Sequence, residues 1–155
     1  MSAVKSVMLA VEVATGKREQ VAKGLLHVLR THTFAQDQMA QLESYAAETE
    51  ARWAAAAQIS TTPELMRHHY QFMDRLQHAI GLQIGVLEST ARNVELAKRL
   101  LLEAEFRLAS LKQVLKKKQT DLRFLQTRRE QKQMDEFAAQ RSQRSAHTNV
   151  NGERS

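Results

Sequence analysis

The feature that most constrains the fold is a row of apolar residues that recurs at every seventh position. The row begins at Met66 and ends at Leu122, and no position between them breaks it. Its members are Met66, Met73, Ile80, Leu87, Val94, Leu101, Leu108, Leu115 and Leu122. Such a repeat predicts a long coiled-coil helix. At 1.5 Å per residue the row spans roughly 85 Å, which leaves no room for a globular core with an enclosed pocket.

The first part of the chain carries a seven-residue pattern of its own, in two rows. One row consists of Val4, Val11, Arg18, Leu25, His32, Met39, Ala46 and Trp53. The other consists of Val7, Ala14, Val21, Val28, Ala35, Leu42, Thr49 and Ala56. A polar residue in such a row usually fixes the register of the coiled coil at some cost in stability. We interpret Arg18 and His32 in that way.

The two patterns are separated by a short break at 59–64. Thr62 suits a helix N-cap, Pro63 suits the first helical position, and Glu64 is favourable beside the positive helix terminus. Two apolar stripes joined by a short turn must fold back on each other. The sequence therefore predicts an all-α fold, a long antiparallel two-helix coiled-coil hairpin. We expect a single domain over 1–140, with helix one at about 3–58, a turn at 59–62 and helix two at about 62–140.

The expected arms are unequal in length. Folding at about residue 60 places Val4 opposite Lys116, so that the end of helix two overhangs helix one. Residues 141–155 are polar and rich in Ser and Asn, which predicts a disordered basic tail. Charge is also unequal, because residues 110–155 hold eleven basic and five acidic side chains of a chain whose net charge is +6. A basic end favours an acidic protein surface, nucleic acid or anionic lipid.

Composition excludes several kinds of chemistry. The absence of cysteine excludes disulfides, thiolate metal sites and a cysteine nucleophile. No pair of histidines has the spacing of a helical metal site, so we expect no metal, no cofactor and no catalytic residues, and we expect the His68–His69 pair to be solvated. No stretch approaches the ~18 apolar residues of a membrane span.

Two surfaces are candidates for binding. Near the turn, antiparallel packing should bring Tyr45 beside Phe72 or Ala79 on one edge of the hairpin. Such a patch either docks a partner or merely covers the coiled-coil core. On the overhang, basic residues accompany an apolar face of Met134, Phe137 and Ala138 that no part of helix one would cover.

Three segments resemble the FliJ family of flagellar type III export proteins. They are KQMDEFAAQR at 132–141, YQFMDRLQHAI at 70–80, and the spacing of Gln38, Leu42 and Tyr45, within a resemblance that extends over about 3–140. The resemblance implies an antiparallel two-helix coiled coil without enzymatic activity. It also implies a cytoplasmic protein at the flagellar base, associated with the inner face of the membrane only through its partners.

The family further implies partners and sites. Its members resemble the central stalk of rotary ATP synthases, promote assembly and turnover of the hexameric export ATPase FliI, reach the export gate protein FlhA, and recruit export chaperones. The gate-binding patch carries over onto Gln38, Leu42, Tyr45, Phe72, Leu76 and Ala79. The end predicted to face the ATPase comprises Lys116, Lys117, Lys118, Arg128, Arg129, Met134 and Phe137.

Three other functions compete with this interpretation. The equivalent stalk of a virulence-type secretion system would share the fold and the ATPase contact but usually lacks the MDEFA run. A generic dimerising scaffold would instead form a stable parallel dimer. A nucleic-acid binder would suit the basic charge, but no nucleic-acid module or stacking aromatics accompany it, so no nucleic-acid partner is expected.

Overall fold

A computed structural model describes residues 2–153 of the chain, and the side chains of residues 3–149. Two helices account for almost all of it, α1 at Ser2–Ile59 and α2 at Pro63–Glu153, with no strand in the described range. The prediction of an all-α helical hairpin is confirmed. The residues cluster into two units, Ala14–Phe106 and the pair Met1–Val13 with Arg107–Ser155. No helix within 2–153 is long and apolar enough to cross a membrane.

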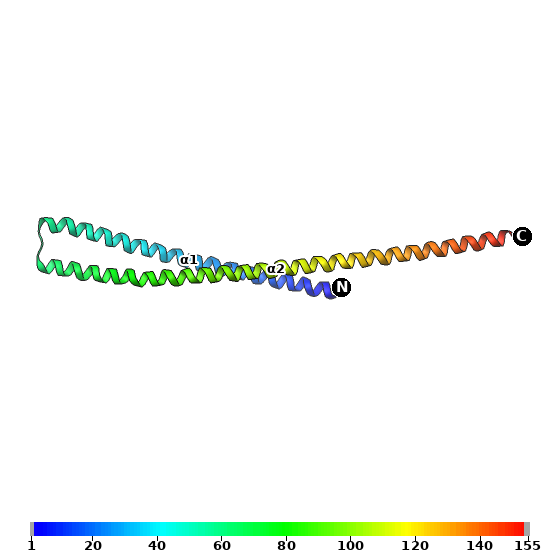
Figure 1. Ribbon diagram of the computed structural model, residues 1–155, viewed down its shortest axis with the longest axis horizontal. Helices are drawn as coiled ribbons and strands as arrows, with labels where there is room; N and C mark the ends of the chain where they lie inside the picture. Colours follow the sequence, from blue (N-terminus) through cyan, green and yellow to red (C-terminus); the bar gives the residue numbers. More distant parts are fainter. Residues whose placement is uncertain (1, 154–155) are drawn as a thin grey trace. The chain divides into compact units, whose positions relative to one another are not determined.

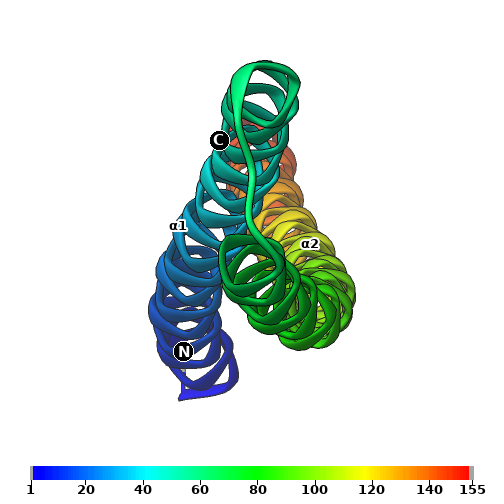
Figure 2. The same ribbon diagram turned by 90° about the vertical axis from the view of Figure 1, so that its left-hand side faces the viewer.

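The turn at residues 60–62 is fixed by hydrogen bonds at both of its ends. At the end of α1, the Ser60 amide donates to the Ala56 carbonyl at 3.1 Å. At the start of α2, the Thr62 hydroxyl accepts from the Leu65 amide at 3.2 Å, and the Met66 amide donates to the Thr62 carbonyl. Thr62 is therefore the N-cap that the sequence predicted, with Pro63 at the first helical position. Figure 2 shows this connection as it passes from α1 to α2.

The unit Ala14–Phe106 is an antiparallel pair of helical arms (Figure 1). Its most buried apolar side chains lie at heptad spacings on the two helices: Ala14, Ala35, Met39 and Ala46 on α1, and Leu76, Val94 and Ala104 on α2. Small alanines make up much of this core, and no described side chain falls below 2% exposure. A two-helix seam can shield side chains on one face only, so it buries a narrow stripe.

The second unit contains the start of α1 and the later part of α2. Val4, Val7 and Val11 are half-buried, as are Leu111, Leu115 and Leu122, whereas Leu108 is buried. After Leu122, every side chain described up to residue 149 is exposed. In Figure 1 this stretch of α2 runs on beyond the start of α1. The apolar row thus ends where the packing partner ends.

The structure differs from expectation at the end of α2. The helix was expected to finish near 140 and to give way to a disordered tail, but α2 continues to Glu153. No proline follows Pro63, and no glycine occurs between Gly85 and Gly152. Local sequence therefore supplies no break until Gly152. The last two residues of the expected tail lie outside the described range.

Candidate functional site

The patch predicted near the turn comes together around one aromatic pair. The rings of Tyr45 and Phe72 meet edge to face, with centroids 5.9 Å apart and planes at 82°. Such a geometry stabilises an aromatic pair beyond the area that it buries. Tyr45 remains 48% exposed and Phe72 is half-buried. The pair thus presents an aromatic surface while part of each ring packs on the hairpin.

The other patch residues differ in how accessible they are. Gln38 is exposed, Leu42 and Ala79 are half-buried, and Leu76 is buried at 8% exposure. Leu76 therefore belongs to the core row more than to the surface. A partner docking here would meet Tyr45, Gln38 and the exposed part of Phe72, whereas Leu76 is shielded from it.

Next to the turn, a histidine occupies the core. His69 is buried at 8% exposure, which corrects the expectation of a solvated His68–His69 pair, although His68 is exposed. The His69 ring stacks on Trp53 at 4.4 Å, with the planes only 8° apart, and its Nε2 lies 3.4 Å from Glu50 Oε2. The flat stack and the carboxylate explain why burial of a polar ring is tolerated.

Two further polar residues of α2 bond across to α1. Gln83 Nε2 donates to the Ala35 carbonyl at 2.9 Å. His32 Nδ1 lies 2.7 Å from the hydroxyl of Thr90, a buried residue. The Thr90 hydroxyl is also 2.9 Å from the Val86 carbonyl and 3.1 Å from the Leu87 carbonyl of its own helix. The hydroxyl can donate to one of these carbonyls while it accepts from a protonated His32 Nδ1, or it can donate to an unprotonated Nδ1.

One more cross-helix pair lies farther from the turn, where Arg18 Nη2 is 3.6 Å from Glu105 Oε1. We call these four contacts, through His69, Gln83, Thr90 and Arg18, the polar layers. Sequence reasoning identified His32 and Arg18 as register-setting residues but missed their α2 partners. For Thr90, the partner of His32, the signal was the row that recurs every seven residues at His69, Leu76, Gln83, Thr90, Ala97 and Ala104; Glu105, the partner of Arg18, lies outside this row. Its polar members concealed it from a search for apolar repeats.

The predicted ATPase-facing end is exposed throughout. Lys116, Lys117, Lys118, Arg128 and Arg129 form no ion pair with any residue in the described range. The Arg128 guanidinium lies 5.8 Å from the centre of the Phe124 ring, within reach of a cation–π interaction. Met134 and Phe137 are 73% and 66% exposed. They line a surface depression together with Gln133 and Ala138.

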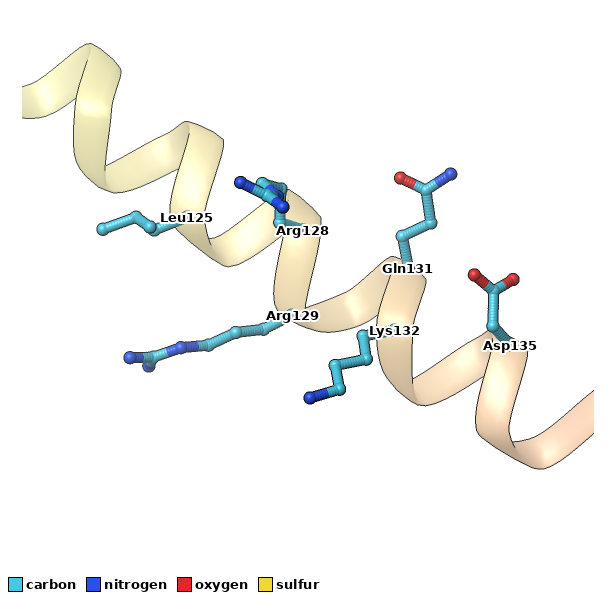
Figure 3. Close-up of a pocket in the computed structure, with 6 residues that line it drawn as sticks. All are labelled: Leu125, Arg128, Arg129, Gln131, Lys132 and Asp135. Carbon is cyan, nitrogen blue, oxygen red and sulfur yellow. The ribbon is translucent and has the colours of Figure 1, made fainter.

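The basic side chains form a local cluster one turn before this apolar face. Figure 3 shows Leu125, Arg129 and Lys132 extending to the same side of α2, while Asp135 projects elsewhere. An apolar side chain beside two long cationic ones suits a surface that is both acidic and apolar. The arrangement supports binding to a macromolecule.

The described residues contain no group of three or more His, Cys, Asp or Glu side chains placed to hold a metal ion. What the hairpin offers is a set of contact surfaces on rigid helices. A profile of the family described as Flagellar FliJ protein matches residues 9–147. No curated protein and no solved structure matches the chain.

Proposed function

Since the chain belongs to the FliJ family, and is therefore a non-catalytic component of the flagellar export apparatus, we propose that it is the coiled-coil stalk of that apparatus. In this role the basic end of α2 binds the hexameric export ATPase FliI and promotes its assembly. The patch near the turn contacts the export gate protein FlhA. The hairpin also recruits export chaperones and is held at the inner face of the membrane through its partners.

One observation carries the ATPase contact. From residue 123 to residue 149 every side chain of α2 is exposed, and this stretch contains the apolar Phe124, Leu125, Met134 and Phe137. Apolar side chains that gather on a helix without an intramolecular partner are typical of a surface that inserts into another protein. The unpaired lysines and arginines beside them would add attraction to an acidic ring lining.

The gate contact rests on the aromatic pair. Tyr45 and Phe72 form an edge-to-face pair that is rigid and amphipathic, with Gln38 exposed on the same edge. Aromatic side chains that are already held in place lose little conformational entropy when they bind. This arrangement favours docking over the alternative that the rings only cover the core.

The test is ATP hydrolysis by the cognate export ATPase, titrated with the full chain. We expect stimulation accompanied by hexamer formation. Charge reversal at the basic end should raise the concentration needed for half-maximal stimulation by about tenfold or more, because charge complementarity is lost. The variant carries glutamate in place of Lys116, Lys117, Lys118, Arg128 and Arg129. Higher salt should weaken the wild-type response in the same direction.

A matched pair of substitutions separates this site from net charge in general. Arg128→Glu with Arg129→Glu should weaken stimulation, whereas Arg67→Glu with Arg75→Glu, on exposed residues near the turn, should not. Helical content is measured for each variant. If the folded chain does not stimulate the ATPase, the proposed stalk function is wrong. If both pairs of substitutions weaken stimulation equally, the assignment of the binding site to the basic end of α2 is wrong.

A further inference from the structure

A second binding surface lies in the middle of the unit Ala14–Phe106, away from the turn. The two arms leave a groove there, whose lining includes Val21, Gly24 and Val28 of α1 and Asn93, Leu96 and Leu100 of α2. Asn93 supplies its polar side chain, and the rest of this set is apolar or glycine. Leu96 is 50% exposed and Leu100 45% exposed. Two leucines therefore present apolar surface to solvent beside the groove.

The groove follows the same edge of the hairpin as the aromatic pair. Gly24 and Tyr45 are separated by whole heptads on α1, as are Phe72 and Leu100 on α2. Residues separated by whole heptads share one side of a coiled-coil helix. The distance along α1 from Tyr45 to Gly24 is roughly 30 Å. The groove is thus a separate surface on a shared edge.

Gly24 keeps the floor of the groove open. A Cβ atom placed on Gly24 would meet nothing within 4 Å, so packing within the hairpin does not require glycine here. Glycine in a helix interior costs about 1 kcal/mol relative to alanine. Glycine at this position lets another backbone approach closely, as small residues do at helix–helix contacts.

The charges along the groove have one predominant sign. Lys17 shares the heptad position of Gly24 on α1, and Arg92 and Arg99 each lie about one helical turn from Leu96 on α2; all three are exposed. None of them forms an ion pair within residues 3–149. Glu103, a carboxylate, lies about one turn from Leu100. Three unpaired cations beside an apolar floor repel a second copy of the same surface and attract acidic groups.

We propose that this groove binds an acidic amphipathic helix of a partner protein. The partner helix lies along the two arms as a third strand of the coiled coil, with its apolar face on Leu96 and Leu100. Gly24 allows its backbone to come close, and its glutamates and aspartates pair with Lys17, Arg92 and Arg99. This surface is distinct from the aromatic patch and from the basic end of α2.

The experiment uses two helical probe peptides, each about three heptads long and bridged chemically to hold the helix. Both carry the same leucines at heptad positions, and their remaining positions hold glutamate in one peptide and lysine in the other. Each is titrated by fluorescence anisotropy against the full chain. We expect the acidic peptide to bind at least about tenfold more tightly than the basic one, with affinity falling as salt rises.

Glycine substitutions identify the site without disturbing the fold. Gly24→Leu fills the groove, so it should abolish peptide binding while the melting temperature stays equal or rises. Gly81→Leu is the matched control, since a Cβ at Gly81 also meets nothing within 4 Å and Gly81 does not line the groove. Binding by this control should be unchanged. Leu96→Ser with Leu100→Ser should weaken binding, whereas Ile84→Ser, at an exposed residue outside the groove, should not.

Several results would overturn the proposal. Equal binding of the two peptides, or no binding of either, would show that the surface does not select acidic helices. Binding that survives Gly24→Leu would place the peptide elsewhere. A concentration-dependent dimer in sedimentation that is lost with Leu96→Ser and Leu100→Ser would show that a second copy covers the groove instead.

Discussion

At the scale of single residues, neighbours within the aromatic patch differ most in burial. Phe72 and Leu76 lie one helical turn apart, yet Leu76 is buried in the seam while Phe72 is half-buried against Tyr45. Truncating a buried leucine typically costs 2–5 kcal/mol through lost burial and the cavity that remains. The same truncation at Phe72 removes a ring that is partly at the surface. Truncation of Leu76 should therefore lower stability, whereas truncation of Phe72 should mainly weaken binding to a partner.

Phe72→Ala should lower affinity for the proposed gate partner by about tenfold or more, with only a modest fall in melting temperature. Leu76→Ala should instead lower the melting temperature strongly. Binding titrations and thermal unfolding by circular dichroism distinguish the two effects. Phe106→Ala is the matched control, because Phe106 is 76% exposed and lies outside the patch. If Phe72→Ala destabilises the hairpin as much as Leu76→Ala, the ring belongs to the core cover.

Sequence reasoning anticipated the pairing of Tyr45 with Phe72 because heptad positions and the turn together determine which edges meet. It did not anticipate burial of His69. Counting apolar repeats treats every polar side chain as solvated, but the burial of His69 depends on Trp53 and Glu50, residues of the other helix. Contacts of that kind arise from the register of two arms and have no local signature.

At the scale of the helices, the polar layers constrain how the arms align. Alanine and leucine seams tolerate sliding by one heptad, since each apolar side chain finds an equivalent neighbour. The contact between His32 and Thr90 is more selective, because a shift of one heptad in one direction places Ala97, which has no polar side-chain group, opposite His32. The bond from Gln83 to the Ala35 carbonyl is less selective, because every residue of α1 carries a backbone carbonyl. A slip that leaves His32 unpaired would cost about 1–3 kcal/mol. Hydrogen bonding thus adds to apolar packing in specifying the register.

Replacing His32 and Thr90 together with leucine should raise the melting temperature and loosen the register. The chain has no cysteine, so cysteines placed at the exposed Glu43 and Gln77 can carry spin labels without competition. Measurements by electron paramagnetic resonance should give one population of distances between the two spin labels in the parent protein. The leucine variant should show a second population, displaced by about 10 Å along the helix for a one-heptad slip.

Thr31→Leu provides the control for this experiment, because Thr31 is exposed and its hydroxyl bonds only to the His27 carbonyl of its own helix. It should retain one population. A single unchanged distance in the His32 and Thr90 variant would mean that the remaining contacts suffice to hold the register.

At the scale of the whole molecule, packing and charge are divided along α2. The early part of the helix packs against α1, and its acidic and basic residues nearly balance. The last part has no packing partner within the described residues and carries an excess of basic residues. The boundary of the apolar row and the excess of basic residues were both evident from sequence. The length of the helix was not, because a polar composition predicts solvation but does not decide between solvated helix and solvated coil.

Hydrogen exchange followed by mass spectrometry should distinguish the packed part of α2 from the part without a packing partner. Amides at 73–108 should exchange slowly, because opening there disrupts the seam. Amides at 123–149 should exchange far faster, because helices without tertiary packing are only marginally stable in water. Addition of the export ATPase should slow exchange in the second segment selectively. Uniform protection along free α2 would contradict this and would point to self-association of the exposed segment.

The polar layers also prescribe an order of folding. The layer of Trp53, Glu50 and His69 is nearest to the turn and closes the shortest loop, so its entropic cost is the lowest. Ala35 with Gln83 comes next, then His32 with Thr90, and Arg18 with Glu105 last. Each closed layer reduces the effective loop that the next must close. The hairpin should therefore zip outward from the turn, so that its folding rate depends on residues 50–69 far more than on the length of its arms.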